Sequence, residues 1–253
     1  AVCVKVIKGE INPFDECALE CALQIENAEI TVVSMGAAAT KPALDRISRL
    51  GISRIILLSD SRLAGSDTLA TSYALSCVIK KINPQLVICG RQSIDGDTAQ
   101  VGPCLSELLG YGLITNIMEM QVSDKVYCET RMGHDETDFP AVLTVERINT
   151  LRFPRMGSKV KEVEIINADD AEIDTVRCGL SGSPTKVLKS FESSRGSRKC
   201  RFISMEELDE TIAAALKKAK EEIKPQTGGE KLESITVIGA ELENTAKELA
   251  HNV

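Results

Sequence analysis

The stretch "PQLVICGRQSIDGDTAQVGP" (Pro84–Pro103) joins a short apolar run to a polar loop and then to a helical pattern that continues to Leu109. A short run of Leu, Val, Ile and Cys residues bounded by turn-forming residues is typical of a buried strand. Because the helical pattern begins near Thr98, the loop lies where the strand passes into a helix. The stretch therefore predicts one strand–loop–helix unit of an α/β fold.

Similar units make up the first half of the chain. We expect strands over residues 1–7, 28–35, 53–60 and 84–90, and helices over about 13–26, 41–50, 66–81 and 98–109. Strands that are almost continuously apolar are buried on both faces, which requires helices on both sides of a parallel sheet. The sequence thus predicts a doubly wound, mostly parallel α/β domain.

The second half of the chain breaks this alternation. Residues 113–132 predict two strands joined at Ser123–Asp124, and the run 140–146 predicts another, so we expect antiparallel strands to extend the sheet. The basic segment 152–163 and the Gly- and Ser-rich segment 180–197 are typical of exposed connections. A helix over 204–223, begun by Ser204 and Glu207 as a capping box, and a strand and helix over 235–253 complete the prediction. We expect two parts, an α/β domain over 1–177 and a C-terminal arm with helices over 178–253.

The composition argues against several classes of function. The chain has 253 residues and a net charge of -7, and its basic residues are scattered, whereas nucleic-acid binding needs a concentrated cationic face. No apolar run approaches the roughly 20 residues of a membrane span, so we expect no membrane insertion and a cytoplasmic protein. With only two histidines, His-based catalytic triads are hard to build.

The nine cysteines are an odd number and none forms a C-x-x-C pair. Cys17 and Cys21 lie four residues apart on one face of a predicted helix, which would allow a shared metal ion, but no second pair of ligands appears. We therefore expect reduced thiols in the core and no metal site.

The ligand-binding region is expected at the carboxyl ends of the strands, near the point where strand order reverses. Three expected strand ends carry small or polar residues: Cys3–Lys5 with the following "INPFDE", Met35–Gly36, and the loop after Gly90. We expect all three to face one crevice.

The loop after Gly90 contains no lysine, and its only cation is Arg91. Asp97 is a natural helix N-cap, which would leave the amides of Thr98, Ala99 and Gln100 free to hold a pyrophosphate. Gly96 would let the backbone approach a ligand, and Asp95 suits a ribose hydroxyl. An ordinary capped turn between a strand and a helix fits these features equally well.

Four motifs, taken together and in this order, resemble the beta subunits of the electron-transferring flavoproteins. They are "INPFDECALECAL", "CGRQSIDGDTAQVGP", "PAVLTVE" and "GLSGSPTKV". The resemblance implies an adenine-nucleotide-hydrolase-like α/β fold and a heterodimer with an alpha subunit that holds FAD. It also implies that the beta subunit binds a second nucleotide, AMP in ordinary members and FAD in bifurcating members. "DGDTAQVGP" and "GLSGSPTKV" are similar to the bifurcating type.

A bifurcating member takes electrons from NADH. It passes one to a low-potential acceptor, a ferredoxin or flavodoxin, and the other through the alpha subunit to a flavin-dependent dehydrogenase, such as an acyl-CoA dehydrogenase. The resemblance implies that the nucleotide contacts Cys3, Asn12, Pro13, Phe14, Asp15, Met35, Gly90, Arg91, Gln92, Ile94, Asp95, Gly96, Asp97, Thr98, Ala99, Gln100 and Val101. We assign Arg91 a catalytic role, because a cation beside a flavin stabilises its reduced form. The alternative is a surface ion pair between Arg91 and Asp95.

The resemblance also implies two contact regions for partner proteins. The segment 152–163 corresponds to the loop that docks dehydrogenases, and we expect Met156 to be its apolar docking residue. The arm from Leu180 onward is expected to contact the alpha subunit through Val187, Leu188 and Phe191. Only "IKGE" separates the first strand from "NPFD", where the family has a long hairpin that bears on NADH binding.

Two other functions remain open from the sequence. One is an AMP-binding, non-bifurcating beta subunit. The other is a nucleotide-binding regulatory module without a redox role. A yellow chromophore on this chain would favour flavin, and a colourless adenylate would favour the alternatives.

Overall fold

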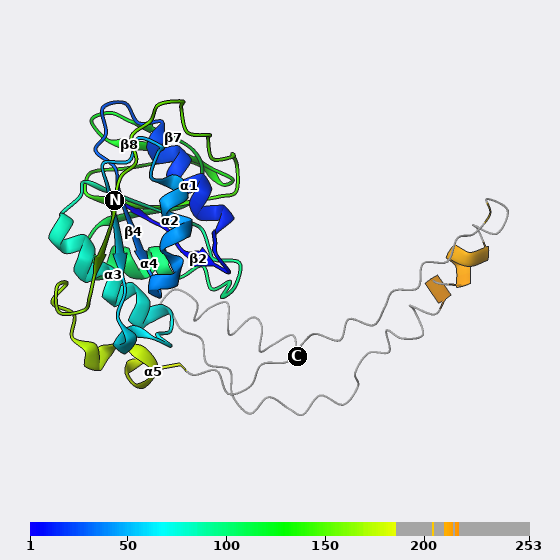
Figure 1. Cartoon of the computed structure of the whole chain (residues 1–253). Helices are drawn as coiled ribbons and strands as arrows, with labels where there is room; N and C mark the ends of the chain where they lie inside the picture. The colour runs from blue at the N-terminus through cyan, green and yellow to red at the C-terminus, as the bar shows by residue number, and fades with distance from the viewer. Residues whose placement is uncertain (186–203, 205–209, 215, 218–253) are drawn as a thin grey trace, which may run out of the picture. The chain divides into compact units, whose positions relative to one another are not determined.

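The computed structural model describes residues 1–185, 204, 210–214 and 216–217 (Figure 1). The chain divides into two compact units, Ala1–Ser190 and Phe191–Val253. In the second unit, residues 210–214 and 216–217 are helical and fall within the helix predicted for 204–223. The strand and helix predicted for 235–253 lie outside the described residues. The fold described below is that of the first unit.

A nine-stranded sheet forms the centre of the first unit, in the order β11-β5-β4-β1-β6-β10-β7-β8-β9. The strands are β1 (Val2–Cys3), β4 (Thr31–Met35), β5 (Arg54–Leu58), β6 (Leu86–Gly90), β7 (Gly112–Val122), β8 (Val126–Thr130), β9 (Gly133–Thr137), β10 (Ala141–Val145) and β11 (Val163–Ile166). Every neighbouring pair from β11 to β7 is parallel, and β8 and β9 add two antiparallel pairings at one end. The predicted fold class and its antiparallel extension are confirmed.

Helices cover both faces of this sheet (Figure 1). They are α1 (Pro13–Leu23), α2 (Lys41–Ile47), α3 (Thr68–Ile82) and α4 (Val101–Leu109). Side chains alternate along the buried strands: in β5, Ile55 and Leu57 pack in the core formed with α1 and α2, whereas Ile56 and Leu58 pack in the core formed with α3 and α4. This burial on both faces explains why the strands are continuously apolar in sequence.

The order of the strands reverses at β1. From β1 the chain moves to β4 and β5 on one side, and α3 then returns it to β6 on the other side of β1. The carboxyl end of β1, between those of β4 and β6, is therefore the topological switch point, where ligands bind in open α/β sheets.

Several predicted boundaries were wrong. The strand predicted over 1–7 ends at Cys3, and the chain then forms a separate two-stranded hairpin of β2 (Val6–Ile7) and β3 (Glu10–Ile11). Lys8 and Gly9 turn this hairpin with positive φ angles, 50° and 83°. The helix predicted from Thr98 begins at Val101 instead.

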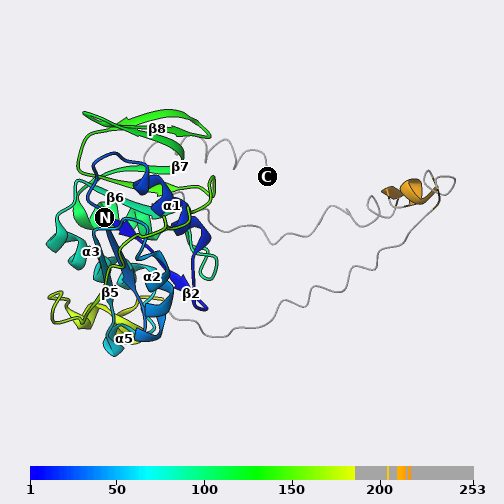
Figure 2. The same cartoon turned by 45° about the horizontal axis from the view of Figure 1, so that its top comes forward.

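Three further segments are more ordered than the sequence suggested. The loop predicted over 152–163 leads into β11, and β9 was not predicted at all. The arm predicted to be exposed from Leu180 begins inside a short helix, α5 (Gly179–Gly182), and Ser183 after it is buried. Figure 2 shows α5 at the opposite end of this unit from β7 and β8. Within the described residues, none of the helices is both long and apolar enough to cross a bilayer.

Candidate functional site

A cavity of about 870 Å³ opens at the switch point. This volume lies within the range of roughly 300–1,000 Å³ that is usual for small-molecule and cofactor sites. Its walls come from the carboxyl ends of β1, β4, β5 and β6, from the start of α3, and from the loop between β6 and α4. The three strand ends picked out in the sequence do face one crevice.

Asp15 in the first turn of α1 joins two of these strand ends. Its carboxylate accepts hydrogen bonds from the backbone N–H groups of Lys5, at 2.8 Å, and Gly90, at 2.9 Å. Lys5 follows β1 and Gly90 ends β6, so one buried side chain fixes the floor of the cavity. A Cβ at Gly90 would lie 2.6 Å from the carbonyl carbon of Phe14, so only glycine allows α1 to approach so closely.

Asn12, which is almost fully buried, fixes the loop that follows Gly90. Its Nδ2 donates to the carbonyl of Gln92 at 2.8 Å, and its Oδ1 accepts from the amide of Ile94 at 3.3 Å. The "NPFD" motif is thus the support on which the cavity loop rests.

The loop presents a row of free backbone donors to the cavity. Among the described residues, the N–H groups of Thr98, Ala99, Gln100 and Val101 have no acceptor in the protein, and all four residues line the cavity; we call them the donor row. Ala99 has a positive φ of 55° and Gln100 follows in the right-handed helical region, a pairing that makes an anion-binding concavity of backbone amides. The start of α4, which has no side-chain cap, adds the positive end of the helix dipole. The arrangement suits a phosphate or pyrophosphate group.

Asp97 is not the N-cap that the sequence predicted. Gln100 is the N-cap residue, and Asp97 has a positive φ of 53° and accepts a hydrogen bond from the side chain of Gln92. Because two residues near the predicted start have left-handed backbones, the helix cannot begin before Val101. Thr98, Ala99 and Gln100 still provide free amides, but as a turn before the helix.

The two cations of the cavity are each paired with a carboxylate. Lys5 Nζ lies 2.8 Å from Asp95, and Arg91 Nη1 lies 3.0 Å from Glu146, whose side chain is 9% exposed. The alternative pairing of Arg91 with Asp95 is therefore wrong. Glu146 follows β10, and the backbone amide of Arg91 also bonds to the carbonyl of Val145, so Arg91 is held on the cavity wall from two sides.

The thiols in the wall are not nucleophiles. Burial raises the pKa of Cys3 to about 12 and raises the pKa of Cys89 well above its usual value. Both side chains stay protonated at neutral pH, and thiol reactivity requires the thiolate. Cys3 and Cys89 therefore provide apolar surface for a ligand rather than covalent chemistry.

Most of the predicted contact residues do surround the cavity. Those that line it are Cys3, Asn12, Asp15, Met35, Gly90, Arg91, Gln92, Asp95, Gly96, Thr98, Ala99, Gln100 and Val101. Pro13, Phe14, Ile94 and Asp97 do not line it, and Ile94 is 58% exposed. Of the partner-docking residues, Met156 is fully exposed, whereas Val187, Leu188 and Phe191 lie outside the described residues.

One wall of the cavity was missed in the sequence. It consists of residues in the connection from β5 to α3 and in the first two turns of α3, namely Ser59, Asp60, Ser61, Leu63, Ala64, Gly65, Ser66, Asp67, Thr68, Thr71 and Leu75. The available signal was "SDSRLAGSDT", a polar stretch directly after the buried strand of residues 54–58.

No group of three potential metal-ligating side chains occurs within the part of the chain that the structure describes. Cys17 and Cys21 both belong to α1 and point into the core, and both bond to Asn149: Cys17 Sγ donates to its carbonyl, and its side-chain amide donates to Cys21 Sγ. Their spacing reflects core packing.

A family model described as "Electron transfer flavoprotein domain" matches residues 1–171, which include every residue that lines the cavity. The chain belongs to the electron transfer flavoprotein family. It is 44% identical to the electron transfer flavoprotein subunit beta of Megasphaera elsdenii over 201 residues, which cover 71% of this chain and 74% of that relative. The predicted membership of the beta subunits is thereby confirmed.

Two other relatives extend this comparison. This beta subunit is 38% identical to protein FixA of Azotobacter vinelandii over 220 residues, covering 79% of this chain and 78% of FixA. It is 36% identical over 196 residues to CarD of Acetobacterium woodii, a subunit of a caffeyl-CoA reductase–Etf complex, covering 72% of this chain and 75% of CarD.

Proposed function

We propose that this beta subunit binds FAD in the cavity at the switch point and passes electrons from NADH onward by flavin-based bifurcation. One electron goes to a ferredoxin or flavodoxin, and the other goes through the alpha subunit to a flavin-dependent dehydrogenase. When bound, FAD would supply the redox chemistry, namely two-electron reduction by NADH and one-electron transfer to the acceptors. The residues of this chain bind and orient the cofactor and set the charge around it.

The observation that carries this proposal is the donor row. Four consecutive amides without an acceptor among the described residues, beside an uncapped helix N-terminus, match the two anionic groups of a pyrophosphate. A pyrophosphate is present in FAD and absent from AMP. The cavity continues from the donor row along the ends of four strands to Met35 and Ser61, which provides room for the rest of a dinucleotide.

The proposed partners follow from membership of the family and from an exposed segment. We propose an alpha subunit as the obligate partner, a dehydrogenase acting on acyl-CoA-type substrates as the electron acceptor, and the cytoplasm as the location. The relative CarD is a subunit of a caffeyl-CoA reductase–Etf complex, and this supports a reductase that acts on a CoA ester as the partner proposed here.

The proposed dehydrogenase contact is the basic segment that contains Phe153 and Met156. Both side chains project almost entirely into solvent, with Phe153 92% exposed. Arg152 anchors the segment, because its guanidinium and amide bond to the carboxylate of Glu20 in α1 at 2.7–3.1 Å. Large apolar side chains held exposed on an anchored segment are typical of protein interaction sites.

The proposal is tested by purifying the alpha–beta heterodimer and counting its flavins. We expect two flavins per heterodimer, and rapid bleaching of the flavin of the beta subunit when NADH is added without oxygen. A heterodimer with one flavin, tightly bound AMP and no direct reaction with NADH would overturn the bifurcating assignment and leave the simple electron carrier. A bound adenylate with no flavin in the complex would favour the regulatory module.

Arg91 and Glu146 are expected to shift the reduction potential of the bound flavin in opposite directions. Arg91→Gln removes a positive charge from the cavity wall, so the reduced flavin is less stabilised and the potential becomes more negative. Glu146→Gln leaves Arg91 without its counter-charge, so the potential becomes more positive. Each shift should be on the order of 30 mV, which corresponds to an interaction of about 1.4 kcal/mol for a two-electron couple.

Spectroelectrochemical titration of the heterodimer measures these potentials. The double variant Arg91→Gln/Glu146→Gln is the control, and we expect it to lie near the wild type because it removes both charges. Shifts of the two single variants in the same direction would indicate a structural disturbance and would exclude the assigned electrostatic role of Arg91.

A further inference from the structure

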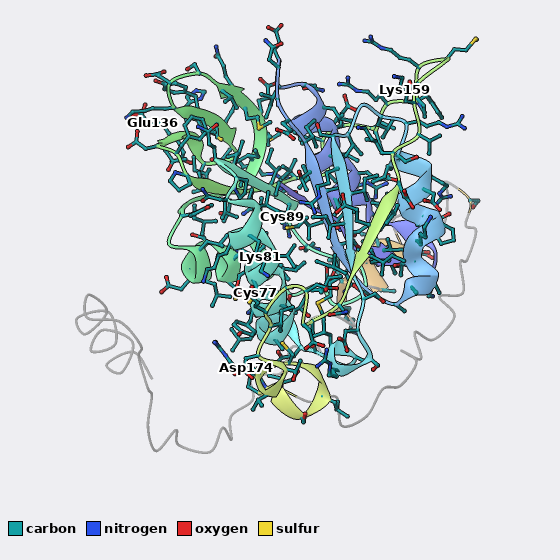
Figure 3. All side chains as sticks on the ribbon, turned by 60° about the vertical axis from the view of Figure 1, so that its left-hand side comes forward. Cys77, Lys81, Cys89, Glu136, Lys159 and Asp174 are labelled. Carbon is teal, nitrogen blue, oxygen red and sulfur yellow. The ribbon has the colours of Figure 1, made fainter. Side chains whose placement is uncertain are left out.

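The start of α3, which forms one wall of the cavity, is held by a segment more than a hundred residues away in sequence. Ser66, Asp67 and Thr68 line the cavity, and the segment 174–185 packs against them; we call it the latch segment. It includes the short 3-10 helix Thr175–Arg177 and α5. Figure 3 labels Asp174 at the start of the latch segment and Cys77 on the neighbouring α3.

The first half of the latch segment is anchored along α3. The backbone amide of Asp174 donates to the hydroxyl of Tyr73 at 3.3 Å, and the guanidinium of Arg177 lies 3.9 Å from the centre of the Tyr73 ring. Cys178 is buried, with its Sγ 3.8 Å from the carbonyl of Ala70. These contacts place the rest of the latch segment at the amino-terminal end of the helix.

The second half bonds to the cavity wall itself. The amide of Gly179 donates to Ser66 Oγ at 2.8 Å, and Ser183 Oγ accepts from the amide of Asp67 at 2.8 Å. Thr185 donates its amide and its hydroxyl to Asp67 Oδ2, at 2.9 and 2.8 Å.

Asp67 connects the start of α3 to the latch segment. While Oδ2 binds Thr185, Oδ1 accepts from the amide of Ala70 at 3.0 Å and caps α3. Although burial acts in the opposite direction, hydrogen bonds from Ala70 and Thr185 lower the pKa of Asp67. The carboxylate therefore remains ionised at neutral pH and serves the helix and the latch segment at the same time.

The start of α3, which the latch segment holds, contacts the donor row. The hydroxyl oxygens of Thr68 and Thr98 lie 3.4 Å apart, and both residues line the cavity. Movement of Thr68 away from Thr98 would widen the cavity where the phosphates of a nucleotide are expected. The position of the latch segment is thus transmitted to the donor row through Asp67 and Thr68.

We propose that the latch segment sets the width of the nucleotide cavity, with Asp67 and Thr185 as positioning residues that do not themselves need to touch the nucleotide. The inference rests on the proposed function only in naming the ligand a nucleotide. The latch segment leads directly to Val187, Leu188 and Phe191, where contacts with the alpha subunit are expected.

The test uses the alpha–beta heterodimer, freed of bound nucleotide, in three forms: wild type, Thr185→Val and Thr185→Ser. Valine keeps the shape of the side chain and the backbone hydrogen bond but lacks the hydroxyl, whereas serine restores the hydroxyl. Binding of FAD and of AMP is measured separately by titration calorimetry. Hydrogen exchange of residues 60–71 is followed in the same samples without nucleotide.

We expect Thr185→Val to bind the nucleotide about tenfold more weakly, the effect of losing one hydrogen bond to a carboxylate, and Thr185→Ser to bind like the wild type. Exchange in residues 60–71 should rise in Thr185→Val alone. If the wild type binds a nucleotide and Thr185→Val binds it equally well, the positioning role is excluded. If the wild type binds neither FAD nor AMP, the proposed function fails instead. The hydrogen exchange of residues 60–71 then tests the role of the latch segment by itself. Unchanged exchange in Thr185→Val would show that the latch segment does not hold the cavity wall.

Discussion

Replacing Gly102 by alanine is expected to displace the start of α4 and to abolish tight nucleotide binding. A Cβ at this position would lie 3.2 Å from the Sγ of Cys89 and closer still to the Cγ2 of Thr144. Both neighbours are buried in strands β6 and β10 and cannot move aside, so the first turn of the helix must move away from the sheet. The donor row ends at Val101 and moves with it.

The cost of the clash exceeds the gain in helix propensity, so we expect Gly102→Ala to be less stable than the wild type. Overpacking a core costs about 1–3 kcal/mol, and this contact is closer than real Cβ atoms adopt, which places it at the upper end. Alanine stabilises a helix by about 1 kcal/mol relative to glycine, and this gain only partly offsets the clash. We expect a net loss of about 1–2 kcal/mol in the free energy of unfolding, measured by thermal and denaturant unfolding, together with loss of the bound nucleotide.

A second substitution provides the matched control. Thr144→Ser removes the Cγ2 that the new Cβ would meet but keeps the Oγ that accepts a hydrogen bond from the amide of Asn116 at 2.9 Å. The double variant Gly102→Ala/Thr144→Ser should therefore recover stability and nucleotide content, and Thr144→Ser alone should resemble the wild type. If Gly102→Ala alone retains its nucleotide and its melting temperature, the close approach of α4 to the sheet does not position the donor row.

The fold was predictable where burial shapes the sequence. Strands β4, β5 and β6 are apolar on both sides because helices cover both faces, and the prediction found each of them within three residues of its bounds. The missed strands lie outside this rule. β9, "GHDET", is exposed along almost its whole length, and only Val163 of β11 is buried. A strand at the edge of a sheet is held by backbone hydrogen bonds to one neighbour. These bonds do not require apolar side chains, so the sequence shows no apolar pattern there.

The candidate site was predictable in its position but not in its internal pairing. The carboxyl ends of parallel strands meet at one edge, so Cys3, Met35 and Gly90 were expected together, and they are. The partners of Arg91 and Lys5 are 55 and 90 residues away in sequence, and no local pattern identifies them. The start of α4 was misplaced for another reason: Asp97 and Ala99 adopt positive φ angles, which the sequence does not encode as glycine would.

The stability that Asp15 confers is expected to increase as the pH falls from 8 to 5. Burial raises the pKa of this carboxyl from 3.8 to about 6, although the hydrogen bonds from Lys5, Asn12 and Gly90 act to lower it. Between pH 6 and pH 4 the folded chain therefore holds a proton that the unfolded chain has released, and folding is favoured by protonation. For these two pKa values, the contribution of Asp15 to the free energy of unfolding is about 1.4 kcal/mol larger at pH 5 than at pH 8.

The measurement is the difference in free energy of unfolding between the wild type and Asp15→Asn. Asparagine does not titrate, and the contributions of the other titrating groups are common to both proteins and drop out of the difference. This difference should rise on going from pH 8 to pH 5. Asp67→Asn is the control: the pKa of Asp67 is lowered, so its carboxyl is ionised in both states across this range and the corresponding difference should stay constant. A wild type that instead loses stability relative to Asp15→Asn at pH 5 would mean that the hydrogen bonds from Lys5 and Gly90 outweigh burial. The ionised carboxylate, and not its protonated form, would then hold the ends of β1 and β6 together.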